Sequence, residues 1–76
     1  MPAKKSAANQ ALGKAIRAVR KRKGYTQRSF AAHAGLDRSY IGAIERGEFN
    51  VTVDTIMTIA TGLEVSAMSL FERADL

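Results

Sequence analysis

The sequence predicts an all-α fold, a compact bundle of five short helices. Apolar residues recur at the three- and four-residue spacing of amphipathic helices, and no segment shows the strict alternation of a half-buried strand. Capping residues precede most of the apolar segments, and a glycine follows three of them. The single proline stands at position 2 and interrupts none of them. At 76 residues, the chain is expected to form one small domain.

The first helix is expected to follow a flexible basic arm at residues 1–7, so that the folded domain covers residues 8–76. The helix should run from about residue 8 to residue 23, because apolar residues form one stripe there. Gly24 then ends it, since glycine readily adopts the left-handed conformation that stops a helix. The stripe consists of Leu12, Ala15, Ile16 and Val19.

The second and third helices are separated by a tight turn. Thr26 is a suitable N-cap for a helix over residues 27–34, and Asp37 for a helix over residues 38–46. Gly35 lies between them, where the turn requires a residue that tolerates positive φ.

Two more helices complete the bundle. Thr52 is expected to cap a helix over residues 53–63, and Ser66 a short helix that follows. In the short helix, Leu70 and Phe71 are expected to close the core. The buried face of the longer helix should consist of Ile56, Ile59, Ala60 and Leu63.

The charges divide the chain into two halves of opposite sign. Residues 1–36 hold nine lysines and arginines and no acidic residue, whereas residues 37–76 hold three arginines and seven acidic residues. This division favours one surface for a polyanion and another for a different contact. The chain has no cysteine, one histidine and no long apolar run, so we expect no metal, no cofactor and no membrane insertion. The cytoplasm is the expected compartment.

The segment 27–46 has the residue pattern of a helix-turn-helix. Helices that cross at a wide angle through a short turn must approach closely, and Ala31 is the small residue at the expected crossing. Leu36 fills the turn. A generic helical hairpin is the alternative, but it leaves the basic half of the chain unexplained. The inward residues of the two helices are expected to be Phe30, Ala34, Ile41 and Ile44.

The residues expected to face outward from the third helix are those that the major groove of DNA would meet. Arg38 and Ser39 stand in the N-terminal part, which enters the groove first. Arginine can bind both O6 and N7 of guanine, and Ala43 can touch a thymine methyl group. Gly42 leaves room for close approach to DNA, although a merely tolerated glycine is the alternative. Arg46 lies on the same outward face.

In these segments the sequence resembles the Cro/repressor-type helix-turn-helix family, the xenobiotic-response-element-like regulators. The resemblance is carried by IRAVRKRKGYTQ, FAAHAGLDRSYIGAIERG and VDTIMTIATGLEVSAMSLF, at residues 16–27, 30–47 and 53–71. It implies a lambda-repressor-like bundle and a sequence-specific transcriptional regulator. Its partners would be double-stranded DNA with a palindromic operator, a second copy of the chain, and RNA polymerase. Glu64 departs from the family, which prefers glycine there.

The resemblance also implies roles for single positions. Gln27 matches a residue that contacts DNA phosphate and supports the base-reading side chains, and Arg28 joins it at the DNA. Arg38 and Ser39 match base readers. Tyr40 and Arg46 match phosphate contacts, with Gly42 and Ala43 on the same face. Arg20 and Glu45 match a structural ion pair, and a phosphate contact is the alternative for Arg20.

With no long segment expected beyond the bundle, the resemblance points to stand-alone regulators. These are phage-type repressors, controller proteins of restriction–modification loci, and small antitoxin-like repressors. The length is most like that of the controller group.

Two other classes of function compete with DNA binding. Ser29, His33 and Asp37 are spaced four apart and faintly suggest a catalytic triad, but Asp37 is needed as a helix cap, so we expect no enzyme and no catalytic residue. A protein-interaction module, such as an antitoxin-like partner-binding protein, is the stronger alternative. It is supported by the apolar last third of the chain, where a two-fold dimer contact is expected at Leu63, Val65 and Met68.

Overall fold

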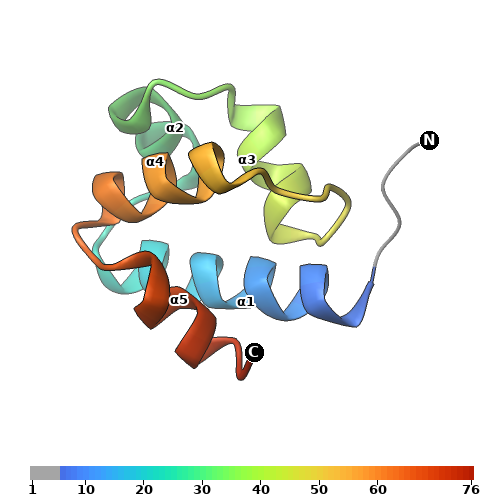
Figure 1. The fold of residues 1–76 in the computed structure, drawn as a ribbon. Coiled ribbons are helices and arrows are strands. Elements are labelled where there is room, and N and C mark those ends of the chain that lie inside the picture. Colours follow the sequence, from blue (N-terminus) through green and yellow to red (C-terminus); the bar gives the residue numbers. More distant parts are fainter. Residues whose placement is uncertain (1–5) are drawn as a thin grey trace.

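A computed structural model describes residues 6–76, which form five α-helices and no strand (Figure 1). The main helix contacts form a closed ring in the order α1, α3, α2, α4, α5 and back to α1. The predicted all-α bundle of five helices is therefore confirmed. The helices are α1 (Ala7–Arg22), α2 (Gln27–Ala34), α3 (Arg38–Glu45), α4 (Val53–Leu63) and α5 (Ala67–Arg73).

The start of α1 differs from the predicted boundary. The backbone N–H of Asn9 donates a hydrogen bond of 3.0 Å to the hydroxyl of Ser6, so Ser6 is the N-cap and the helix begins at Ala7. The prediction places Ser6 and Ala7 in the flexible arm, because the apolar stripe that marks the helix begins only at Leu12. The rest of the predicted arm, residues 1–5, lies outside the described residues.

All four predicted N-caps are confirmed. In each, a side-chain oxygen accepts a hydrogen bond from a backbone N–H two or three residues later, over 2.8–3.1 Å. These bonds satisfy donors that the first turn of a helix would otherwise leave unpaired. The four caps are Thr26, Asp37, Thr52 and Ser66.

Glu64 ends α4 in the left-handed conformation, with φ of 60°. Its N–H donates to the carbonyl of Thr61 over 3.1 Å, as in a helix end closed by glycine. The departure from glycine at this position therefore leaves the shape of the helix end intact.

The core consists of apolar side chains from every helix. Leu70 of α5 is fully buried, but Phe71 is 39% exposed, so the prediction that Phe71 closes the core is wrong. Consecutive helical residues point about 100° apart, and in α5 it is Leu70 that points inward. The largest fully buried side chains are Phe30, Ile16, Ile41, Ile44, Ile59, Leu63 and Leu70.

α1 and α3 touch through their backbones. A Cβ atom added to Gly13 would lie 2.6 Å from the carbonyl oxygen of Glu45 and closer still to that of Ile44. Any side chain at position 13 would therefore push the C-terminal end of α3 away from α1. This close approach fixes where α3 lies relative to the rest of the bundle.

No helix in residues 6–76 combines the length and apolar content that crossing a membrane requires.

Candidate nucleic-acid interface

α2 and α3 meet as the predicted helix-turn-helix geometry requires. Ala31, at the crossing, is 2% exposed. Gly35 adopts φ of 72°, and the N–H of Leu36 then donates to the carbonyl of Ala31 over 2.8 Å. This bond closes the end of α2 and sets the direction in which the chain enters α3. The turn is thus built from the small residue, the glycine and the apolar plug at the predicted positions.

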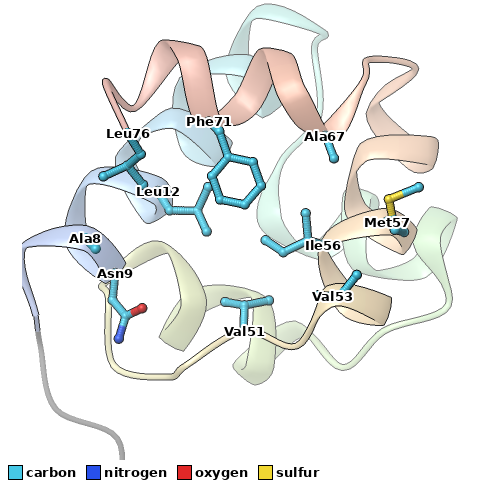
Figure 2. A pocket seen from close by; sticks show the side chains of 10 residues that line it. All are labelled: Ala8, Asn9, Leu12, Val51, Val53, Ile56, Met57, Ala67, Phe71 and Leu76. Carbon is cyan, nitrogen blue, oxygen red and sulfur yellow. The ribbon is translucent and has the colours of Figure 1, made fainter.

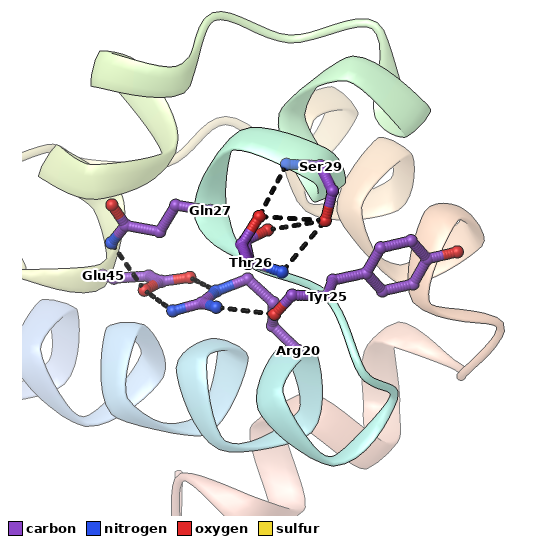
Figure 3. A network of polar contacts seen from close by, with 6 residues as sticks. All are labelled: Arg20, Tyr25, Thr26, Gln27, Ser29 and Glu45. Atoms are coloured by element: carbon purple, nitrogen blue, oxygen red, sulfur yellow. Dashed lines mark hydrogen bonds and ion pairs between the residues drawn. The ribbon is translucent and has the colours of Figure 1, made fainter.

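A buried ion pair joins α1 to the end of α3 (Figure 3). The guanidinium of Arg20 donates to both carboxylate oxygens of Glu45, over 2.6 and 2.9 Å. The same guanidinium donates to the carbonyl oxygen of Tyr25 over 2.9 Å. The side chains of the pair are 6% and 2% exposed, so Arg20 does not face DNA as a phosphate ligand.

Gln27 is the third member of this network. Its amide nitrogen, Nε2, donates to Oε1 of Glu45 over 3.0 Å, so the first residue of α2 is tied to the last residue of α3. The Gln27 side chain is half-buried, in contrast to the exposed Arg28 that follows it. The network therefore connects the buried Arg20–Glu45 pair to Gln27, which is partly exposed at the surface of the helix-turn-helix.

The start of α3 presents Arg38 and Ser39 to solvent, as predicted. Asp37 accepts from both the backbone N–H of Ser39, over 2.8 Å, and its hydroxyl, over 2.6 Å. These two hydrogen bonds lower the pKa of Asp37 below its ordinary value of 3.8. The Ser39 hydroxyl is therefore oriented as a donor towards the cap, and its oxygen lone pairs remain available to accept.

The predicted outward position of Ala43 is wrong, and that of Gly42 needs a qualification. Ala43 is 5% exposed and faces the bundle, so its methyl group does not lie on the outer surface. Gly42 is also buried, but by side-chain ends: a Cβ atom there would lie 3.1 Å from a guanidinium nitrogen of Arg46 and 3.6 Å from Oε1 of Gln27. Helical periodicity places Gly42 between Arg38 and Arg46 on one face but cannot show that neighbouring side chains cover it.

Tyr40 and Arg46 are each engaged within the chain. The Tyr40 ring packs edge-on against Phe49 at a centroid distance of 5.6 Å, and its hydroxyl lies 3.4 Å from the hydroxyl of Thr55. Arg46 is exposed and forms a bidentate pair with Glu48 over 2.9 and 3.1 Å. The hydrogen bonds and charge of Glu48 raise the pKa of Arg46. An exposed pair of this kind contributes little to stability, so Arg46 can exchange it for a phosphate.

A basic hollow lies between the end of α1 and the starts of α2 and α3. Lys21, Arg28 and Arg38 line it, and no acidic side chain does. On α1, Arg17 is exposed, while Lys14 and Arg22 line separate hollows that include Arg73 of α5. The remaining residues of the basic hollow are Arg20, Tyr25, Thr26 and Gln27.

The three residues of the possible catalytic triad each make a different contact and do not bond to one another. The Ser29 hydroxyl completes the cap of α2 by accepting from the N–H of Thr26 over 2.9 Å. His33 stacks on Tyr25 at a centroid distance of 5.2 Å, and Asp37 caps α3. Within residues 6–76, no group of three or more histidine, cysteine or acidic residues is placed to hold a metal ion.

The predicted dimer contact is partly wrong. Leu63 is 1% exposed and belongs to the core, whereas Val65 is half-buried and Met68 is 71% exposed. Leu63 instead belongs to the predicted buried face of α4 with Ile56, Ile59 and Ala60, and that prediction is confirmed.

A larger apolar surface lies across α4 and α5, within the apolar last third of the chain but beyond the three residues of the predicted dimer contact. Val53, Met57 and Leu76 are 77%, 51% and 59% exposed. With Phe71 they border an almost entirely apolar pocket of about 250 Å³ (Figure 2). The signal available in the sequence was Val53 and Met57, which lie beside Ile56 on α4 but outside the expected buried face. The other residues that line the pocket are Ala8, Asn9, Leu12, Val51, Ile56 and Ala67.

Comparison with known proteins gives consistent similarities. A family model described as helix-turn-helix matches residues 16–70. The chain is 37% identical over 65 residues to control protein C.SmaI of Serratia marcescens, and the match covers 86% of this chain and 77% of that protein. It is 39% identical over 62 residues to the HTH-type transcriptional regulator SlrR of Bacillus subtilis (strain 168), where the match covers 80% of this chain and 41% of that protein.

Solved structures of controller proteins superpose closely on the bundle. The restriction-modification controller protein C.AhdI from Aeromonas hydrophila gives a TM-score of 0.84 at 39% identity, covering 87% of this chain and 100% of that one. The controller protein C.Esp1396I, solved as a tetramer with its natural 35-base-pair operator, gives 0.83 at 37% identity, covering 92% of both chains.

Proposed function

The chain belongs to the helix-turn-helix family, and from this premise we propose that it is a sequence-specific DNA-binding transcriptional regulator. The observation that carries the proposal is the exposed start of α3, where Arg38 stands at the edge of a hollow lined by basic and no acidic side chains. A helix end of this kind fits the major groove, and the surrounding positive charge fits the phosphate backbone. Such a protein acts by binding, so the proposal includes no catalytic step.

Different residues would provide the affinity for DNA and the preference for its sequence. Lys21, Arg28 and Arg46 would neutralise phosphates, which sets register and most of the affinity without reading sequence. Arg38 would bind O6 and N7 of guanine, and the hydroxyl oxygen of Ser39 would accept at a neighbouring base. Tyr40 stays a proposed phosphate contact, for which its hydroxyl would exchange the hydrogen bond to Thr55 for one to a phosphate oxygen.

We further propose that the regulator binds a palindromic operator as a homodimer. A two-fold dimer would place its two α3 helices in successive major grooves, about 34 Å apart. The apolar surface of α4 and α5 would supply the contact through Val53, Met57 and Phe71. The exposed Met68 of α5 and the half-buried Val65 stay proposed contacts. The tetrameric operator complex of C.Esp1396I supports assembly on DNA as the mode of action.

Among regulators, we propose the controller subtype. The matches to C.SmaI and C.AhdI cover 77% and 100% of those proteins, so this chain accounts for most of their length. Regulation would follow from blocking or recruiting RNA polymerase at the operator, and the compartment that this requires is the cytoplasm.

The test is selection of bound DNA from a random duplex pool at near-physiological salt. A palindrome with half-sites about one helical turn apart is the expected result. Binding that is salt-sensitive but blind to sequence would contradict the proposal. It would favour the alternative, a protein-interaction module, for which the exposed apolar surface is the supporting observation.

Replacing Arg38 with alanine tests the base-reading role. We expect Arg38→Ala to weaken binding to the selected site by about 1–3 kcal/mol and to relax preference at one base pair. Titration of the selected duplex and its single-base-pair variants measures both effects. An equal loss on every sequence would assign Arg38 to phosphate instead.

A further inference from the structure

The chain turns sharply at the end of α3 and brings Glu48 back beside Arg46. Gly47 adopts φ of 77°, and its N–H donates to the carbonyl of Ile44 over 3.0 Å. The N–H of Glu48 then donates to the carbonyl of Ala43 over 2.9 Å. These are the two hydrogen bonds of a helix end closed by glycine. The backbone of the bundle therefore holds Glu48 next to the last turn of α3.

The Glu48 carboxylate covers one edge of the Arg46 guanidinium. Nε and Nη2 of Arg46 donate to its two oxygens over 2.9 and 3.1 Å. The remaining nitrogen, Nη1, lies over Gly42, 3.1 Å from where a Cβ atom would be. A guanidinium binds phosphate with the same two-pronged geometry that it uses for a carboxylate. A phosphate at the covered edge would therefore have to displace Glu48, and one at the open end would lie close to its negative charge.

This pair differs from the Arg20–Glu45 pair in its exposure. The side chains of Arg46 and Glu48 are 56% and 38% exposed, whereas those of Arg20 and Glu45 are 6% and 2% exposed. DNA can therefore reach the exposed pair without disturbing the bundle. Because such a pair adds little to the stability of the fold, its two partners separate at a small cost in free energy. That cost is subtracted from the free energy of DNA binding for each chain that binds.

We infer that Glu48 competes with DNA phosphate for Arg46 and thereby limits the affinity of the chain for DNA. The inference rests on the proposed function, in which Arg46 is a phosphate contact. Because phosphate contacts carry no sequence information, Glu48 lowers the affinity for the operator and for unrelated DNA by the same factor. It therefore raises the concentration of the chain at which an operator is occupied, and it leaves the choice of operator to the residues that read bases.

The experiment measures DNA binding by wild type, Glu48→Gln, Arg46→Ala and the double variant, on the selected operator and on an unrelated duplex. Glutamine keeps the size of glutamate and removes its charge. Glu48→Gln should bind both duplexes more tightly, by roughly 2- to 5-fold for each chain bound. In the Arg46→Ala background the same substitution should give little gain, because no guanidinium remains to compete for.

A matched control separates this competition from a general effect of charge. Glu72→Gln makes the same substitution at an exposed residue of α5, so it changes the net charge equally. It should give a much smaller gain in affinity than Glu48→Gln. Thermal unfolding verifies the fold of each variant, and Glu48→Gln should unfold close to the wild-type temperature, since an exposed pair contributes little stability.

Three results would overturn the inference and leave the regulator intact. Unchanged binding by Glu48→Gln would mean that DNA does not use the pair, and weaker binding would mean that Glu48 positions Arg46 for phosphate. An equal gain with and without Arg46 would mean that Glu48 repels DNA directly. Wild-type binding without sequence preference would instead overturn the proposed function, and the four proteins can then still be compared on any duplex.

Discussion

The N-cap Asp37 makes the stability of the start of α3 depend on pH. Its carboxylate accepts two hydrogen bonds from Ser39, and its pKa in the folded chain lies below the ordinary value of 3.8. The unfolded chain therefore binds this proton more tightly. The stabilisation is complete above about pH 3.8 and is lost as the pH falls through the folded pKa.

We therefore expect Asp37→Ala to unfold at a lower temperature than wild type at pH 7, and the difference to shrink only below about pH 3.8. Thermal unfolding followed by circular dichroism from pH 7 to pH 2 measures it. Asp37→Asn, which retains an acceptor that does not titrate, is the control and should differ little from wild type at pH 7. A difference that already disappears near pH 6 would assign the effect to another group.

Gly42 is the residue at which stability and DNA binding should change in opposite directions. Alanine is favoured over glycine in a helix by about 1 kcal/mol, and the added methyl would meet only the flexible ends of Arg46 and Gln27. Gly42→Ala should raise the thermal midpoint and weaken binding to the selected site severalfold, because the methyl displaces the guanidinium of Arg46. Thermal unfolding and duplex titration measure the two effects. Unchanged DNA affinity would show that the space above Gly42 is not used.

The packing of α1 on α3 gives a matched prediction at the level of helices. Gly13→Ala makes the same chemical change as Gly42→Ala, but its methyl would meet the carbonyl oxygens of Ile44 and Glu45, which cannot turn aside. We expect Gly13→Ala to lower the free energy of unfolding by about 1–3 kcal/mol, as overpacked cores do. Urea unfolding of both variants measures the decrease in the free energy of unfolding expected for Gly13→Ala and the increase expected for Gly42→Ala. Equal effects would mean that the helices move apart freely.

The same contrast shows what the sequence predicts at this scale. Helix positions follow from apolar spacing, and the caps at Thr26 and Asp37 follow from local hydrogen bonding, so both were predictable. Burial by residues distant in the chain was not. Ala43, which spacing placed outward, is buried in the bundle, and Gly42 is covered by the side-chain ends of Arg46 and Gln27. Apolar periodicity indicates the faces of a single helix, but it does not indicate which other helices cover those faces.

For the molecule as a whole, the apolar surface of α4 and α5 should control assembly. In a two-fold contact, a charge added at one position meets its own copy or lies near it, so Met57→Glu should dissociate the dimer while each chain stays folded. Sedimentation in the absence of DNA measures the change. Ala18→Glu, which adds the same charge to the exposed side of α1, is the control and should leave the dimer intact. A monomeric wild type would contradict the proposed dimer.

The close contact at Gly13 also determines which changes the lineage of this protein can accept. The backbone of α3 is held from behind by Gly13 and by the Arg20–Glu45 pair, and neither depends on the side chains that face outward. Substitutions at Arg38 and Ser39 therefore leave the frame unaltered and change only the surface offered to DNA. Under the proposed base-reading roles, one or two such replacements would give a gene copy a new operator, while position 13 would stay glycine. One side of α3 can thus change with the DNA target, while the opposite side keeps the fold.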